Sequence, residues 1–253
     1  MQERSVFFRG TLFSAFVAGL LATLPSVAIG EQAAAPQRPG RTFVPGTVAE
    51  AKDKTISVFT RGPKSVSRAT YQQKYLELHT FIGMAYTPNI IGYTVNLTTS
   101  EGGPDAITEL WVPSWTKLFS EPWKPFLLED KARIEADRRN WYDVTSQNFV
   151  VEEKVVKGEP LGLEPGRTPG VKLVWLFRRG ETVPPIPRGA SRVVDNRVLH
   201  NPASMGADGT WQDGDSDIVL IRMAWAKDLA EIGPASAGAI VAYEWRNRPS
   251  PWK

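Results

Sequence analysis

The order of apolar patterns between residues 55 and 157 restricts the fold more than any other feature of this sequence. Residues 55–60 alternate β-branched or aromatic side chains with polar ones, which predicts a strand. Ser67 then favours the start of a helix that runs to about Gly83. The apolar face of this helix carries, at helical spacing, Tyr71, Tyr75, Leu78 and Ile82. The chain therefore passes from a strand to an amphipathic helix across one short turn.

The following segments complete a compact set of elements. Strands are predicted at residues 90–99 and 106–112, separated by the turn residues 101–104. A short helix at 115–120, a longer helix at 126–142 and a strand at 149–157 follow. The order is β-α-β-β-α-β, which is typical of a ferredoxin-like unit with both helices on one face of a four-stranded antiparallel sheet. The other face of such a sheet still needs a partner.

The same order recurs in a degenerate form after a Gly/Pro-rich linker at residues 158–170. Strands are predicted at 171–178, 191–201, 217–225 and 239–247, with a loop at 208–215 and a short helix at 226–232. The proline-rich residues 184–187 stand where the first unit has its long helix, so we expect that helix to be missing. We predict an α+β fold in which ferredoxin-like units at 55–157 and 171–253 pack sheet to sheet as an intrachain α+β barrel.

The N-terminus has the pattern of a secretory signal peptide. Arg4 and Arg9 precede an apolar run of 14 residues at 11–24, and small residues end the segment at Gly30. The run is shorter than the roughly 20 residues of a membrane-spanning helix. We therefore expect cleavage after Gly30, a periplasmic or secreted protein, and no stable membrane anchor. Residues 31–54 are rich in Ala, Pro and Gly, which predicts a flexible arm or linker.

Composition excludes several kinds of site. The chain has no cysteine and two histidines, so disulfides, thiolate catalysis, Cys-ligated metals and multi-histidine metal sites are excluded. The net charge is only +3 and the basic residues are dispersed, which argues against nucleic-acid binding. No phosphate loop, nucleophile elbow or dinucleotide motif occurs. We predict neither a cofactor nor a metal; the expected partner is a small apolar or aromatic molecule, and association into a homo-oligomer stays open.

Several segments together resemble the EthD family of dimeric α+β-barrel proteins. These are VFTR at 58–61, the helix end YLELH at 75–79, the strand GYTVN at 92–96, ELW at 109–111 and the acidic helix at 128–143. The resemblance covers about residues 55–157 and, more weakly, 171–247. It implies a cavity between sheet and helices, in a fold whose relatives include cofactor-free cyclases, decarboxylases, isomerases and monooxygenases. The EthD family itself is associated with ether breakdown. Because the second unit lacks the first helix and its histidine, at most one full pocket is expected.

His79 is the main candidate for chemistry because an imidazole exchanges protons near neutral pH. Tyr75 lies one helical turn earlier and Tyr93 on the following strand, so either phenol can donate to a developing oxyanion. These three residues are the predicted catalytic group. Tyr71, a further turn back, is predicted to bind substrate. The structural alternative is that His79 caps the helix end and the tyrosines belong to the core.

Other candidates are weaker. Arg61 ends the first strand and can hold a substrate carboxylate, and Trp111 can line a pocket for flat molecules; surface and core positions are the respective alternatives. Asp130, Asp137 and Asp143 are interpreted as solvated charges or ion-pair partners of nearby arginines, with orientation of His79 as the alternative.

Two further features are interpreted as structural. His200 lies at a strand end with nothing near it in sequence to complete a site. The aspartates of residues 213–217 begin like a calcium loop, but Ile218 and Ala224 stand where that loop needs glycine and glutamate.

The leading functional hypothesis is an exported EthD-like enzyme that performs cofactor-independent acid–base chemistry of lyase, cyclase or isomerase type. The alternatives are a non-catalytic ligand-binding or structural module, and an oxidoreductase by family association.

Overall fold

The computed structural model describes residues 50–87, 89–99, 102–121, 124–160, 165–205, 211–233 and 237–246. The predicted signal peptide at 1–30 and most of the predicted arm at 31–54 lie outside these ranges. Within the described ranges, none of the helices has the length and apolar character needed to cross a membrane.

The first unit has the predicted order of elements. They are β1 (Asp53–Arg61), α2 (Arg68–Lys74), the π-helical η2 (Tyr75–His79), α3 (Thr80–Tyr86), β2 (Gly92–Thr98), β3 (Ala106–Val112), α4 (Trp115–Ser120), η3 (Leu128–Asp130), α5 (Lys131–Asn140) and β4 (Val144–Lys157). The strands lie in the order β4-β1-β3-β2, all antiparallel. This is the strand order of a ferredoxin-like unit, so the prediction for the first unit is confirmed. The second long helix is shorter than predicted and β4 begins earlier.

The second unit repeats this order without its first helix. Its elements are β5 (Gly166–Arg167), β6 (Val171–Arg178), β7 (Arg192–His200), β8 (Pro202–Met205), β9 (Trp211–Asp213), β10 (Ile218–Ala226), α6 (Leu229–Ile232) and β11 (Ile240–Arg246). The main strands lie in the equivalent order β11-β6-β10-β7. Residues 179–191 contain no helix, as expected from their prolines. Part of the predicted loop at 208–215 forms β9, which pairs with β8 in a hairpin.

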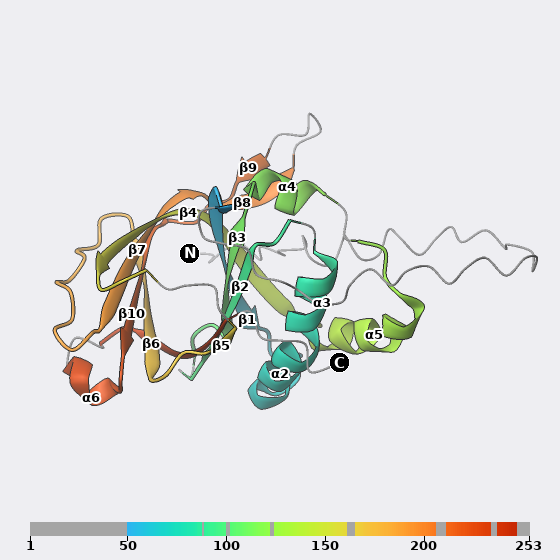
Figure 1. The fold of residues 1–253 in the computed structure, drawn as a ribbon, viewed down its shortest axis with the longest axis horizontal. Helices are drawn as coiled ribbons and strands as arrows, with labels where there is room; N and C mark the ends of the chain where they lie inside the picture. Colours follow the sequence, from blue (N-terminus) through green and yellow to red (C-terminus); the bar gives the residue numbers. More distant parts are fainter. Residues whose placement is uncertain are drawn as a thin grey trace, which may run out of the picture.

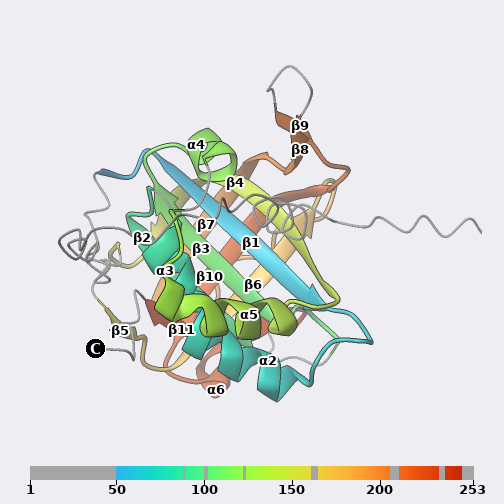
Figure 2. The same cartoon turned by 90° about the vertical axis from the view of Figure 1, so that its right-hand side faces the viewer.

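The two units join edge to edge and close a barrel. The last strand of the first unit, β4, pairs with β7, and the last strand of the second unit, β11, pairs with β2. The closed ring runs β2-β3-β1-β4-β7-β10-β6-β11 and back to β2. The intrachain α+β barrel is therefore confirmed, and both halves lose the open sheet edges that a lone unit would expose. Helices α2, α3 and α5 lie together against the outer face of the first unit (Figures 1 and 2).

Apolar side chains from both units fill part of the barrel interior. Alternate residues of each strand point inward, as the pleat requires. The inward-facing cluster consists of Ile56, Val58, Ile107, Phe149, Val151, Val174, Val194, Ile218, Ile221, Met223 and Trp225. Because strands of both units contribute to this cluster, neither unit can bury its inner face without the other.

A network of buried charges occupies the rest of the interior. Glu109 of the first unit pairs with Lys54 at 2.7 Å and also with Lys172 of the second unit. Lys172 pairs in turn with Glu244 at 2.7 Å. Burial alone would raise the pKa of Glu109, but the charges of Lys172 and Lys54 outweigh it and hold that pKa well below its usual range. One carboxylate thus bridges lysines from both halves of the chain.

The interior positions of the two units correspond to one another. Lys54 lies opposite Trp111 on the adjoining strand, with its ammonium group 4.7 Å from the centre of the indole. Lys172 lies opposite Trp225 in the same way, at 4.4 Å. The register therefore repeats an equivalent lysine–tryptophan pair in each half, which the sequence analysis did not detect.

We expect Glu109→Gln to lower the free energy of unfolding by about 3–5 kcal/mol at neutral pH, because it leaves two buried lysines short of a counter-charge. The Glu109 carboxyl has a depressed pKa when folded, so its contribution is complete above its ordinary value of 4.5 and is lost as the pH falls below it. Urea unfolding at a series of pH values measures both effects.

The matched control is Glu152→Gln, whose side chain is 61% exposed and pairs with Arg197 on the surface. Its cost should be at most about 1 kcal/mol. Equal costs for the two variants would contradict the role assigned to the buried network.

Candidate functional site

The helix over the first unit changes its winding where it carries Tyr75 and His79. Ser67 begins α2 by accepting a hydrogen bond from the backbone N–H of Thr70 at 3.2 Å. Residues Tyr75–His79 form a π-helical segment, after which α3 continues to Tyr86. Such π segments inside helices occur frequently at functional sites. Both Tyr75 and His79 are buried and face the sheet.

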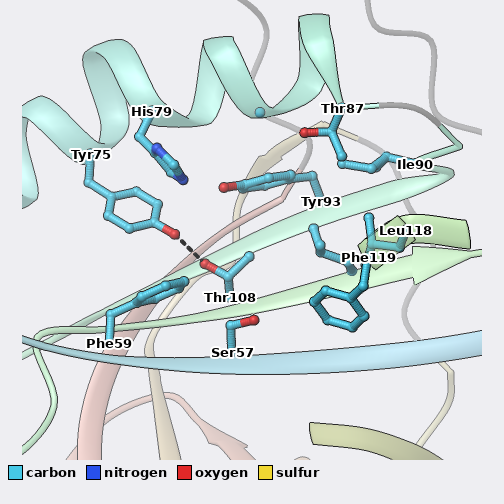
Figure 3. A pocket seen from close by; sticks show the side chains of 12 residues that line it. Ser57, Phe59, Tyr75, His79, Thr87, Ile90, Tyr93, Thr108, Leu118 and Phe119 are labelled. Carbon is cyan, nitrogen blue, oxygen red and sulfur yellow. Dashed lines mark hydrogen bonds between the residues drawn. The ribbon is translucent and has the colours of Figure 1, made fainter. Parts of the chain in front are cut away.

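A cavity of about 70 Å³ lies between this helix and the outer face of the first unit's sheet. Figure 3 shows His79 and Tyr75 descending into it from the helix, with Thr108 and Ser57 rising from the strands. The lining residues are Ser57, Phe59, Tyr75, His79, Gly83, Thr87, Ile90, Tyr93, Thr108, Leu110, Leu118 and Phe119. A mainly apolar space with a few convergent polar groups is typical of a small-molecule site.

Three hydroxyl groups gather on one side of the cavity. The Tyr75 hydroxyl lies 2.5 Å from that of Thr108, and Tyr93 interacts with both. Burial raises the pKa of Tyr75 and of Tyr93, so both phenols stay neutral at physiological pH and keep a proton to donate. Gly83 makes room for Tyr93, because a Cβ atom there would lie 2.9 Å from the tyrosine ring.

His79 is oriented by a carboxylate on the neighbouring helix. Its Nδ1 lies 2.9 Å from Oδ2 of Asp137, and both side chains are almost fully buried. The indole nitrogen of Trp141 lies 2.8 Å from the same Nδ1 and 3.2 Å from Oδ1 of Asp137. The far nitrogen of the imidazole is directed toward Tyr93 and the cavity (Figure 3). The arrangement of nitrogen, ring and carboxylate is that of an oriented general base.

The expectation that Asp137 is a solvated charge was wrong. Asp137 is 6% exposed and lies on the buried side of α5, between Ile134 and Trp141, which follows the helix. A buried carboxylate requires hydrogen-bond partners, and Asp137 finds them in His79 and Trp141. The helical spacing of Ile134, Asp137 and Trp141 was the signal that could have identified it.

The other two aspartates, Asp130 and Asp143, differ in their burial and in their partners. Asp130 is fully buried and pairs with Tyr86 and with Arg133. Asp143 is exposed and accepts a hydrogen bond from the backbone of Lys64. The interpretation as an ion-pair partner of a nearby arginine therefore fits Asp130, whereas Asp143 stabilises a turn.

An aromatic cluster lies at the end of the cavity that α4 lines. Leu118 and Phe119 of α4 line the cavity, and the Phe119 ring lies 5.4 Å from that of Trp211 on the β8–β9 hairpin. Trp115 of α4 contacts Trp211 and stacks on His200 at 5.4 Å. The hairpin belongs to the second unit, which thereby supports one end of the first unit's cavity. His200 takes part in this packing.

The predicted substrate-binding residues lie outside the cavity lining. Tyr71 is fully buried beneath the site, where its ring packs edge-on against Tyr75 and Trp141. Arg61 is held by Asp105 at 3.1 Å instead of facing a pocket mouth. Trp111 points to the opposite face of the sheet from its neighbour Leu110, because successive residues of a strand alternate. The predicted catalytic residues His79, Tyr75 and Tyr93 do come together.

Sequence reasoning missed two polar residues of the sheet. Ser57 and Thr108 sit on the strand face that the helices cover, where most neighbours are apolar. Ser57 donates a hydrogen bond to Oδ1 of Asn148 at 2.7 Å. The signal in the sequence that could have identified them was a hydroxyl side chain on the strand face that the predicted helices cover.

No group of three or more potential metal ligands occurs in the part of the chain that the structure describes. Asp213 lies 3.4 Å from His200, and Asp217 lies 3.2 Å from Arg178, so the described residues of segment 213–217 make local contacts.

The fold and the cavity define an α+β barrel protein with one helix-covered site. No protein-family model matches the chain, and no curated protein matches it. Among solved structures, an anthrone oxidase-like protein is 15% identical and covers 80% of this chain and 95% of its own, with a TM-score of 0.45. Two mutants of the chlorite dismutase from Candidatus Nitrospira defluvii are 8% and 9% identical, each covering 76% of this chain and 90% of its own at a TM-score of 0.37.

The fold class is therefore assigned from the strand order of this chain, and membership of the EthD family stays a prediction.

Titration of the tyrosines tests the burial of the phenols at the site. Burial raises the pKa values of Tyr71, Tyr75 and Tyr93 above their ordinary 10.0. We expect these three of the six tyrosines to stay neutral above pH 10 until the chain unfolds. Because the unfolded phenols ionise there, stability is complete below pH 10 and falls as the pH rises past it.

The ultraviolet absorbance of tyrosinate measures the ionisation of the tyrosines, and circular dichroism recorded at the same pH values measures the loss of structure. Ionisation of all six tyrosines before any loss of structure would contradict the burial of these three phenols. The same titration in denaturant is the control.

Proposed function

We propose that this protein is an enzyme that uses His79 as a general base, without a cofactor, on a small apolar or aromatic compound. The observation that carries the proposal is the position of His79. Its Nδ1 is held by the buried Asp137, and its other nitrogen is directed into the cavity beside Tyr75 and Tyr93. An oriented imidazole next to neutral hydroxyl donors is what proton abstraction beside an oxygen requires.

The reaction that fits these groups moves one proton. The imidazole Nε2 accepts a proton from a carbon next to a carbonyl group of the substrate, and the electron pair of that C–H bond moves through the new C=C bond onto the carbonyl oxygen as the enolate forms. Tyr75 or Tyr93 donates a hydrogen bond to the resulting oxyanion, while Asp137 stabilises the imidazolium. Return of the proton from the imidazolium to another atom of the enolate completes an isomerisation. Departure of a leaving group, which takes the same proton from the imidazolium, completes an elimination. Both outcomes balance without an oxidant.

The walls of the cavity support the choice of substrate class. Phe59, Leu110 and Phe119 supply apolar surface, and the lining contains no aspartate, glutamate, lysine or arginine. The small volume suits a compact, planar molecule. Charged substrates would lose hydration there without a counter-ion.

We also propose that the chain is an exported, EthD-like protein. The support is the signal-peptide pattern of residues 1–30 and the resemblance carried by residues 75–79 and 92–96.

Proton exchange in heavy water tests the proposal without knowledge of the natural substrate. A panel of small cyclic and aryl ketones is incubated with the protein, and loss of the signals of the C–H protons next to the carbonyl group is followed by proton NMR. We expect catalysed exchange on at least one compound, and a fall of about 100-fold or more with His79→Gln. Asp137→Asn should also be impaired, since it changes the group that orients the base.

His200→Gln is the matched control, because it removes the other histidine, which is about half exposed. It should keep the wild-type rate. Exchange that survives His79→Gln would contradict the proposal. Saturable binding without exchange of any compound would instead favour the non-catalytic binding module.

A further inference from the structure

Two side chains compete for the Nδ1 atom of His79. Oδ2 of Asp137 lies 2.9 Å from it and the indole nitrogen of Trp141 lies 2.8 Å from it. An imidazole nitrogen has one in-plane position, which holds either a proton or a lone pair. The indole nitrogen always carries a proton and only donates. The position of this one proton therefore depends on which acceptor Trp141 uses.

The first arrangement leaves a buried carboxylate unsatisfied. If the indole N–H is donated to Nδ1, that nitrogen has no proton and Nε2 must carry one. Oδ2 of Asp137 would then face the lone pair of Nδ1 at 2.9 Å. The carboxylate would lose the hydrogen bonds from both His79 and Trp141. An unpaired buried carboxylate is costly. In this arrangement His79 presents an N–H to the cavity and has no basic nitrogen there.

The second arrangement satisfies every group. The Nδ1 proton is donated to Oδ2 of Asp137, and the indole N–H is donated to Oδ1 at 3.2 Å. Asp137 then accepts two hydrogen bonds, one at each carboxylate oxygen. The Nε2 atom carries a lone pair and faces the cavity.

We propose that Trp141 is a positioning residue that fixes the tautomer of His79 by hydrogen-bonding to Asp137. This inference rests on the proposed function, because the tautomer matters to catalysis when His79 is the base. The indole N–H bonds to Oδ1 of Asp137 and leaves Oδ2 turned to Nδ1 of His79. The proton stays on Nδ1, and Nε2 is left free to accept one.

The packing keeps Trp141 in place for this role. Its backbone N–H bonds to the carbonyl of Asp137 at 3.1 Å, so both side chains leave the same end of α5. Its ring lies 4.3 Å from the centre of His79 and 4.9 Å from that of Phe59. The donor and the carboxylate are therefore fixed to one another before a ligand arrives.

Nitrogen NMR of ¹⁵N-histidine-labelled full-length protein tests the proposal without a substrate. The chain contains only His79 and His200, and His200→Gln assigns the two sets of signals. In wild type at a pH where the ring is neutral, we expect the His79 proton on Nδ1 and an unprotonated Nε2. In Trp141→Phe we expect a substantial Nε2–H population, and for any compound whose exchange is catalysed, kcat lower by about tenfold with KM little changed.

Trp175→Phe is the matched control, because it removes another buried indole, whose N–H donates to the carbonyl of Ala237 at 3.3 Å in the second unit. It should leave the His79 tautomer unchanged.

Asp137→Asn keeps the test decisive if Trp141→Phe does not fold. The indole N–H should hold the amide oxygen, so the amide nitrogen must donate to Nδ1 and the tautomer should invert. If the indole did not direct the side chain, the amide introduced by Asp137→Asn could turn its oxygen to Nδ1 of His79, and the ring proton would stay on Nδ1. An unchanged tautomer in Asp137→Asn would overturn the proposal.

The outcomes separate the two proposals. A wild-type Nε2 that already carries the proton overturns both the tautomer assignment and His79 as resting base. An unprotonated wild-type Nε2 that is unaffected by Trp141→Phe overturns the role of Trp141 alone and leaves the proposed function standing.

Discussion

The pairing of β4 with β7 and of β2 with β11 is the constraint on which the rest of the structure depends. These two seams turn two sheets into one closed wall with an inner and an outer face. The inner face is completed only by residues from both units, including the carboxylate of Glu109 between Lys54 and Lys172. Closure leaves the outer face to the helices. Because residues 179–191 form no helix, the first unit carries the helix-covered cavity.

The chemistry of the site follows from burial. A carboxylate on the buried side of α5 must be hydrogen-bonded, and His79 and Trp141 supply the bonds. The same burial raises the pKa of Tyr75 and of Tyr93, so the cavity combines one oriented base with neutral hydroxyl donors, Tyr75 on the same helix and Tyr93 on β2. No metal or prosthetic group enters the proposed step, whose electrons remain within the substrate.

The sequence predicts much of the fold because each element has its own period and its own turn residues. The β-α-β-β-α-β order, the missing helix at the prolines and the barrel were all accessible from these local signals. The π segment at Tyr75–His79 was not, because helix periodicity over five residues does not distinguish the two windings. The buried lysine network was not, since a charge on a strand normally indicates a solvent-facing side chain, and only closure buries Lys172.

The site was partly predictable for the same reason. His79, Tyr75 and Tyr93 lie on adjacent elements, so local spacing brings them together. The predictions for Arg61 and Trp111 failed because they depend on tertiary contacts. Arg61 pairs with Asp105, and Trp111 lies on the sheet face that the helices do not cover. Asp137 is 58 residues from His79, and its role emerges only when α5 packs beside the π segment.

Titration of phenol into ¹⁵N-histidine-labelled protein tests the central claim, that the cavity beside His79 is the ligand site, most directly. The account predicts saturable shifts of the His79 ring nitrogens at one equivalent per chain, with the signals of His200 unmoved. Saturation that moves only His200, or phenol binding that leaves both histidines unchanged, would contradict it.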